Sequence, residues 1–185
     1  MEADWEYEIS HDAPVIDAHW AGFVDLNAHP ERADSLPEAA HLLTLSETLI
    51  RLNSESSPVW TSKCDFWPVN PEEYGLDADE LDAPPEMLAV ACACYIDLLI
   101  RQSEQWKNPD RTAHDCQTLC ARLRPVQLRC CRVDFVIRKA VLAEEETFGV
   151  TAYFTACGPE VEASKTVLAQ ALHVFTDTVL AAWVC

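Results

Sequence analysis

The stretch CRVDFVIRKAVLAEEETFGVTAYFTAC, residues 131–157, indicates the fold class. In its first half, apolar Val133, Phe135 and Ile137 alternate with mostly polar or charged residues, and its second half repeats the alternation from Phe148 to Phe154. A period of two is typical of a strand with one buried face. The polar AEEET segment between the halves predicts a turn, so the stretch is expected to form an antiparallel hairpin.

A third strand is predicted at residues 59–67, VWTSKCDFW, which is rich in aromatic residues and alternates in the same way. The alternation is expected to place Lys63, Asp65 and Trp67 on one face of that strand. If it lies beside the hairpin, its polar face continues the polar face of the two hairpin strands.

Helices account for most of the other apolar residues. They are expected at about 35–53, 85–106, 111–123 and 159–183. Ser35 and Glu38 resemble a capping box at the start of the first helix. The second contains MLAVACACYIDLLI, residues 87–100, which is apolar almost all round, as a central helix is.

This order of elements predicts an α+β fold. The expected sheet is small and antiparallel, with three strands, or four if the N-terminal arm contributes one, and about four helices pack mainly on one of its faces. Residues 1–34 are interpreted as an acidic arm packed on the domain, and residues 35–185 as a single domain.

The charge is large and uneven. The net charge is −18, and residues 1–84 hold 19 Asp or Glu against 3 Lys or Arg, a net of −16. Nucleic-acid phosphates and anionic membranes are bound through clustered Lys and Arg, which this chain lacks, so direct binding to either is not expected. A basic protein partner is the electrostatic complement of such a chain.

The compartment is expected to be the cytoplasm. The first residues, MEADWEYEIS, show neither a basic nor an apolar segment of a signal peptide. The longest apolar run, Met87 to Ile96, is far shorter than the roughly 18 residues of a membrane span. The nine cysteines, among them Cys92, Cys94 and Cys116, are interpreted as reduced core residues.

The candidate site is the polar face that the three strands would share. Acids, bases and aromatic rings on rigid strands can bind a small polar ligand or a charged protein surface. Its predicted members are Lys63, Asp65, Trp67, Arg132, Asp134, Arg138 and Tyr153. The alternative is an ordinary solvated face that is crossed by ion pairs.

Catalytic and metal sites are not predicted, and neither is a cofactor. The chain has no glycine-rich phosphate loop, no Gly-x-Ser-x-Gly and no His-Glu-x-x-His. Cys157 at a helix start could be an activated thiol, but a core residue is favoured. Asp97 is expected to pair with Arg101 one helical turn later. Metal-ligating residue types near the N-terminus are interpreted as scattered surface residues: His11, Asp17, His19, Asp25 and His29.

Together these features predict a non-enzymatic protein-binding module with an acidic surface. An immunity protein, an antitoxin or a DNA-mimicking inhibitor of a basic partner would have this charge. The alternative is a small-ligand binder or an enzyme that uses the face around Asp65, Asp134 and Arg138. A homodimer is also expected, because the last helix keeps its apolar stripe to Trp183, near the chain end.

Overall fold

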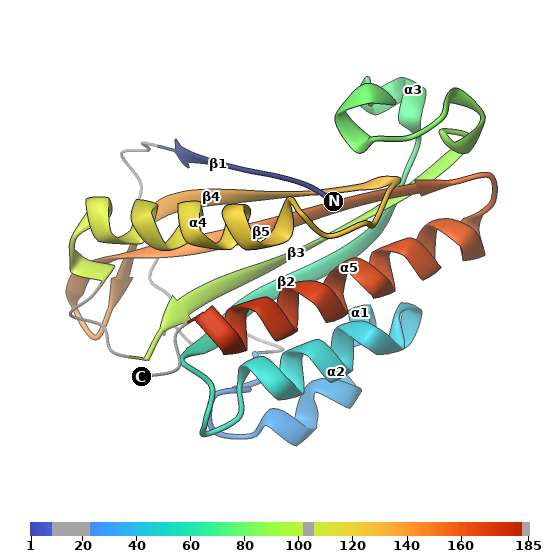
Figure 1. The fold of residues 1–185 in the computed structure, drawn as a ribbon. Helices are drawn as coiled ribbons and strands as arrows, with labels where there is room; N and C mark the ends of the chain where they lie inside the picture. The colour runs from blue at the N-terminus through green and yellow to red at the C-terminus, as the bar shows by residue number, and fades with distance from the viewer. Residues whose placement is uncertain (9–22, 102–105, 183–185) are drawn as a thin grey trace.

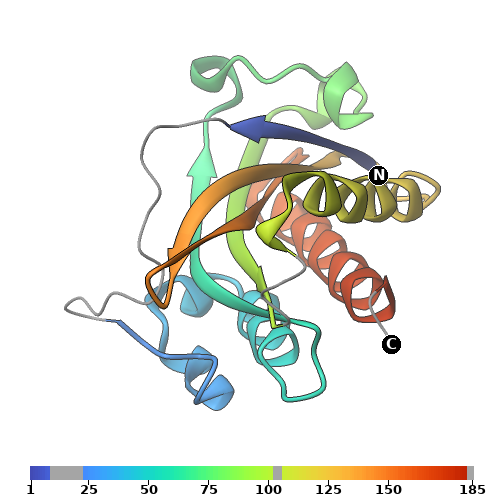
Figure 2. The same cartoon turned by 90° about the vertical axis from the view of Figure 1, so that its left-hand side faces the viewer.

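The computed structural model describes residues 1–8, 23–101 and 106–182. Its centre is a five-stranded sheet with the strand order β1-β4-β5-β3-β2 (Figure 1). The strands are β1 (Glu2–Glu8), β2 (Val59–Val69), β3 (Val90–Ile100), β4 (Cys131–Leu142) and β5 (Glu145–Gly158). β1 runs parallel to β4, and all other neighbouring strands are antiparallel. The sheet is strongly curved (Figure 2).

The expected antiparallel sheet of three or four strands is therefore wrong, because the sheet is mixed and has five strands. The predicted β4–β5 hairpin is confirmed, and Ala143 and Glu144 form its tight turn with positive φ angles of 52° and 66°. The strand near the N-terminus is Glu2–Glu8, and it pairs parallel to β4, whereas the apolar segment 14–26 that suggested a strand in this arm lies mostly outside the described residues. Its partner is more than a hundred residues away, so no local pattern could reveal that pairing.

The main error concerns the helix predicted at 85–106, because residues 90–100 form strand β3. β3 lies between β5 and β2 in the sheet. Its inner residues, such as Cys94 and Ile96, are buried under the helices, and Ala91, Ala93 and Leu99 are buried on the opposite side. A central strand covered on both faces is a continuous apolar run, which periodicity cannot distinguish from a buried helix.

The principal helices are α2 (Leu43–Leu52), α4 (Pro109–Leu123) and α5 (Val161–Ala182), which lie on one side of the sheet (Figure 1). The shorter helical elements are η1 (Pro30–Ser35), α1 (Pro37–His41), α3 (Pro71–Tyr74), η2 (Asp79–Leu81) and η3 (Pro85–Met87), where η denotes a 3-10 helix. Leu42, with a φ of −150°, separates α1 from α2, so the single predicted helix is two. The capping box is also absent there, because the Ser35 hydroxyl donates to the Arg32 carbonyl.

The hydrophobic core fills the space between the inner face of the sheet and these helices. Phe154 of β5 and Phe175 of α5 meet edge to face with ring centroids 5.0 Å apart, and Phe135 of β4 lies 6.1 Å from Phe175. All three are fully or almost fully buried. Burial of such side chains is the dominant favourable term in folding.

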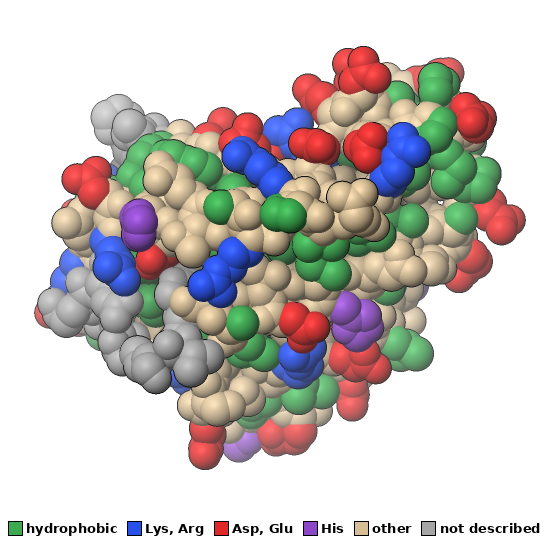
Figure 3. Space-filling model, in the orientation of Figure 1, with side chains coloured by type: hydrophobic (Ala, Val, Ile, Leu, Met, Phe, Trp, Pro, Cys, Tyr) green, Lys and Arg blue, Asp and Glu red, His purple; other side chains and the backbone are tan. Residues whose placement is uncertain are grey.

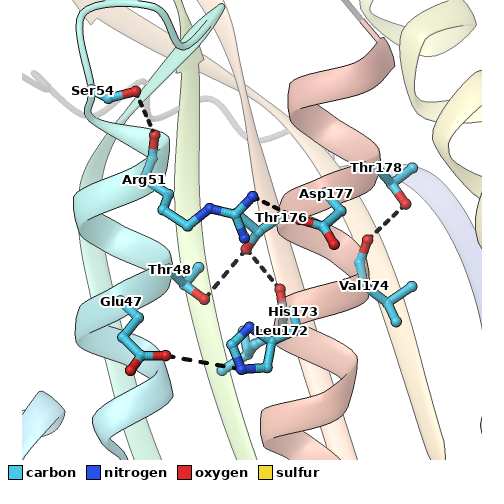
Figure 4. A network of polar contacts seen from close by, with 10 residues as sticks. All are labelled: Glu47, Thr48, Arg51, Ser54, Leu172, His173, Val174, Thr176, Asp177 and Thr178. Carbon is cyan, nitrogen blue, oxygen red and sulfur yellow. Dashed lines mark hydrogen bonds and ion pairs between the residues drawn. The ribbon is translucent and has the colours of Figure 1, made fainter.

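Polar contacts join α2 to α5 at the edge of that core (Figure 4). Arg51 donates to Asp177 over 2.6 Å, and the buried Thr176 hydroxyl donates to Thr48 over 3.3 Å. The turn after α2 is held by Arg101, whose guanidinium donates to the carbonyls of Asn53, Ser54 and Ser57. The expected Asp97–Arg101 pair is therefore wrong: on a strand, residues four apart are too far from each other to pair.

None of the helices in the described part of the chain combines the length and the apolar character needed to cross a membrane.

Candidate functional site

The outer face of the sheet, opposite α2, α4 and α5, carries polar residues from all five strands. One row of paired residues crosses the whole sheet: Asp4, Asp134, Tyr153, Tyr95 and Asp65. This row joins three predicted site residues that are far apart in the sequence. Asp4 and Tyr95 are members that the prediction missed.

The other predicted site residues lie on the same face, so the structure brings all seven together. In the next row, Arg132 pairs with Thr155, and Trp67 pairs with Ala93. Trp67 also packs against Tyr95, with ring centroids 6.2 Å apart.

A β-bulge interrupts the alternation of β2 beside Lys63. The pairing register with β3 shifts between Thr61 and Cys64, so that both of these residues oppose inward-facing residues of β3. Two residues of β2, Ser62 and Lys63, thus lie opposite the single residue Asp97, so β2 has one extra residue at this point. An uninterrupted alternation would place Thr61 on the same face as Lys63, Asp65 and Trp67, whereas the bulge leaves Thr61 buried on the inner side of the sheet.

A hollow of about 490 Å³ lies over β1, β4 and the segment after α3. We name it the acidic hollow. Six carboxylates and two guanidiniums line it: Asp4, Glu6, Glu8, Asp77, Glu80, Asp134, Arg132 and Arg138. Asp77, just before η2, and Glu80, within η2, thus lie in the same hollow as the acids of β1. These segments are about 70 residues apart in the sequence, so only the tertiary structure brings them together.

Both guanidiniums of the acidic hollow are already neutralised. Arg132 Nε donates to Asp134 Oδ1 over 2.7 Å, and its Nη1 lies 3.5 Å from Glu80. Arg138 Nε donates to Glu8 over 2.6 Å, and its Cζ lies 5.4 Å from the centre of the Tyr153 ring. The surplus charge of the hollow is consequently negative.

A second hollow, of about 300 Å³, lies beside the first over the middle of the sheet. We name it the central hollow, and the two share Arg138 and Tyr153. Its floor is a chain of hydrogen bonds in which Arg138 Nη1 donates to Thr151 Oγ1 over 3.0 Å, and that hydroxyl donates to Asp97 over 2.6 Å.

Burial perturbs the acids of this face. Loss of solvent raises the pKa of Asp97, although the Thr151 hydrogen bond and the charges of Arg138 and Lys63 oppose the shift. Loss of solvent likewise raises the pKa of Asp134 and, together with Asp97 and Asp65, raises the pKa of Tyr95 to about 12. Tyr95 is therefore a neutral hydrogen-bonding group at physiological pH.

The prediction missed Asp97 as a member of this face, because residues 87–100 were read as a helix. A signal was present: Tyr95 and Asp97 alternate with Cys94 and Ile96, which is the period of a strand. The signal is short, and the apolar residues on either side obscure it.

The other chemical possibilities gain no support from the described residues. Cys157 has no exposed surface, and burial raises the pKa of its thiol to about 12, so it is not an activated thiol. It also lies in β5, before α5 begins. The described residues contain no group of three His, Cys, Asp or Glu that could hold a metal, and His11, Asp17 and His19 lie outside them.

Comparison of the chain with protein-family models, with curated proteins and with solved structures gave no match.

Proposed function

We propose that the chain is a non-enzymatic binding protein whose acidic hollow receives a basic segment of a partner protein. The observation that carries the proposal is the charge of the hollow, where six carboxylates face two guanidiniums that are themselves held by Asp134, Glu80 and Glu8. The proposal requires neither a metal nor a cofactor.

The remaining carboxylates are suited to a cationic side chain. Glu6 and Asp77 are exposed and make no ion pair with the described residues, and Asp4 lies 3.6 Å from Arg124. The rings of Trp5 and Tyr153 line the same hollow. An aromatic face beside carboxylates favours a Lys or Arg side chain through cation–π attraction as well as charge.

The charge of the whole chain supports the same partner. A net of −16 in the first 84 residues would raise the rate of encounter with a basic surface by one to three orders of magnitude, roughly. Proteins that bind nucleic acid have such surfaces, so an immunity protein, an antitoxin or a DNA mimic fits the proposal. We place it in the cytoplasm, since the eight cysteines in the described part are free thiols.

A direct test is a titration of the full chain against a fluorescent oligolysine peptide, followed by anisotropy. We expect binding that weakens steeply with added salt, because charges are screened beyond about 8 Å at physiological ionic strength. The triple variant Asp4→Asn, Glu6→Gln, Asp77→Asn should weaken binding by about tenfold or more.

The control is a triple variant with the same change in net charge outside the acidic hollow: Glu55→Gln, Glu146→Gln, Glu160→Gln. These three side chains are exposed. If both triple variants lose the same affinity, only the overall charge attracts the peptide and the proposed site is wrong. At a salt concentration of roughly 1 M the screening length falls to about 3 Å. Peptide binding that is unchanged at this concentration would also contradict the proposed site.

A further inference from the structure

We propose that the basic segment of the partner binds as an added β-strand along β1, with Lys or Arg at every second position. This proposal rests on the function proposed above and states the form of the segment that the acidic hollow receives. Three features of β1 support it: an open edge, the spacing of its carboxylates, and the aromatic rings on its other face. Addition of an extended peptide to a sheet edge is a recurring mode of protein recognition.

The edge of β1 is open in the described part of the chain. β1 is the outermost strand there, and β4 is the only strand that pairs with it (Figure 1). The Trp5 amide donates to Asp4 Oδ1 over 2.9 Å, and thus to a side chain instead of a strand. The Ala3 carbonyl likewise accepts a hydrogen bond from Arg124 Nε over 2.9 Å. Since Arg124 occupies the start of the edge, its open part runs from Asp4 to Glu8.

The carboxylates of this open part recur at every second residue. Asp4, Glu6 and Glu8 are exposed and line the acidic hollow. Acidic side chains gather along this rim of the molecule, between β1 and α3 (Figure 3). Residues directly opposite each other on neighbouring strands lie on the same face, about 5 Å apart, and opposite charges stabilise such pairs. A strand with Lys or Arg at every second position would therefore place one cation beside each carboxylate.

The middle carboxylate is the one with the least competition. Glu8 pairs with Arg138, and Asp4 lies 3.6 Å from Arg124. Glu6 makes no ion pair with the described residues, so a cation of the partner would be its first. An added strand would also offer a carbonyl to the Trp5 amide, which would release Asp4 for a second cation.

The intervening residues of β1 present an aromatic surface. The rings of Trp5 and Tyr7 meet edge to face with centroids 5.6 Å apart, and Tyr7 is 39 % exposed. Aromatic and β-branched residues form favourable cross-strand pairs, so the preferred segment alternates basic residues with residues of these kinds. A second copy of β1 would bring acids against acids, and like charges oppose that pairing.

The first test compares two fluorescent peptides of equal composition, titrated with the full chain and followed by anisotropy. Thr-Lys-Thr-Lys-Thr-Lys-Thr can place all its lysines on one face of a strand, and its isomer Thr-Thr-Lys-Lys-Lys-Thr-Thr cannot. We expect the alternating peptide to bind at least about fivefold more tightly. Equal affinities would overturn strand addition and leave the basic partner in place, whereas binding of neither peptide would contradict both proposals.

Backbone methylation of the alternating peptide tests the pairing itself. In a strand, the N–H groups of alternate residues point to the same side. Methylation of every lysine amide therefore removes the donors of one edge, and methylation of every threonine amide removes those of the other, while the charge stays the same. We expect one of the two methylated peptides to bind at least about tenfold more weakly than the other. Equal affinity of the two, whether retained or lost, would overturn strand addition.

Two single variants form a matched pair on the side of the protein. Glu6→Gln removes a carboxylate from the open edge, and Asp77→Asn removes an exposed one that lines the acidic hollow outside β1. Glu6→Gln should weaken binding of the alternating peptide several-fold, roughly, and that of its isomer less. Asp77→Asn should weaken binding of both peptides alike. If Glu6→Gln also affects both peptides alike, the lysines do not pair across strands and the proposal is wrong.

Discussion

At the scale of single residues, burial sets the chemistry of the cysteines. The buried thiols include Cys116, Cys131 and Cys157, each at most 1 % exposed. Burial raises the pKa of Cys131 and of Cys157 to about 12, because the low-dielectric interior disfavours the thiolate. The thiolate is the reactive form, so these cysteines are protected by both access and ionisation.

We therefore predict that the seven buried thiols of the described residues react slowly with a thiol reagent at pH 8, where an exposed thiol with a pKa of about 8.5 reacts readily. The unfolded protein prepared under nitrogen should yield close to nine thiols. Recovery of three or fewer thiols would show disulfides instead.

The raised pKa values of the buried thiols also predict that the protein loses stability in alkali. From about pH 9 upward the unfolded thiols release protons that the folded ones retain until about pH 12, so the free energy of unfolding should fall with rising pH in that window.

At the scale of elements, the junction between β5 and α5 depends on close approach of backbone to backbone. A Cβ added at Gly158 would lie 2.7 Å from the Ser164 nitrogen and 3.1 Å from the Ala163 carbonyl carbon, both near the start of α5. Neither atom can move without shifting the helix. α5 carries Phe175, so a shift of the helix would disturb the packing of the core.

We predict that Gly158→Ala lowers the free energy of unfolding by about 1–3 kcal/mol, as overpacking generally does. The matched control is Gly149→Ala, whose added Cβ would lie 3.4 Å from the Leu98 carbonyl oxygen, an ordinary contact. That variant should stay within about 0.5 kcal/mol of the parent. Urea denaturation of the two variants measures both values, and equal stabilities would show that α5 adjusts without cost.

At the scale of the whole molecule, the two edges of the sheet bear on self-association. The edge strand β1 carries Glu2, Asp4, Glu6 and Glu8, and the edge strand β2 has a bulge and Pro68. Charges, bulges and proline all discourage pairing of edge strands between molecules. A dimer, if it forms, should therefore not extend the sheet.

We predict a homodimer through the nearly neutral second half of the chain, with Trp183 at its interface. The rest of the apolar stripe of α5, such as Leu172 and Phe175, is buried in the core of the monomer. Trp183, on which this expectation rests, lies outside the described residues. Trp106 is fully buried and its indole N–H donates to Asp115, so it adds no area to an interface. Light scattering at micromolar concentration should give twice the chain mass of 20.7 kDa, and Trp183→Ala should shift it toward the monomer. A monomeric parent, or a dimer that this variant leaves intact, would contradict the prediction.

The sequence by itself determined the elements whose signal is local. The alternation in residues 131–157 was enough for the β4–β5 hairpin, and the apolar stripes were enough for α4 and α5, because side-chain periodicity directly reflects which face is buried. The same alternation assigned Arg132, Asp134, Arg138 and Tyr153 to one face before any pairing was known.

Only the tertiary structure decided the rest, because it depends on partners that are distant in the sequence. Residues 90–100 are a strand since β5 and β2 flank them, and their apolar composition alone suits a helix equally well. The parallel pairing of β1 and the bulge at Ser62 depend on hydrogen bonds to strands elsewhere in the chain. The acidic hollow and the central hollow form where these non-local elements meet, so neither could be predicted from the sequence.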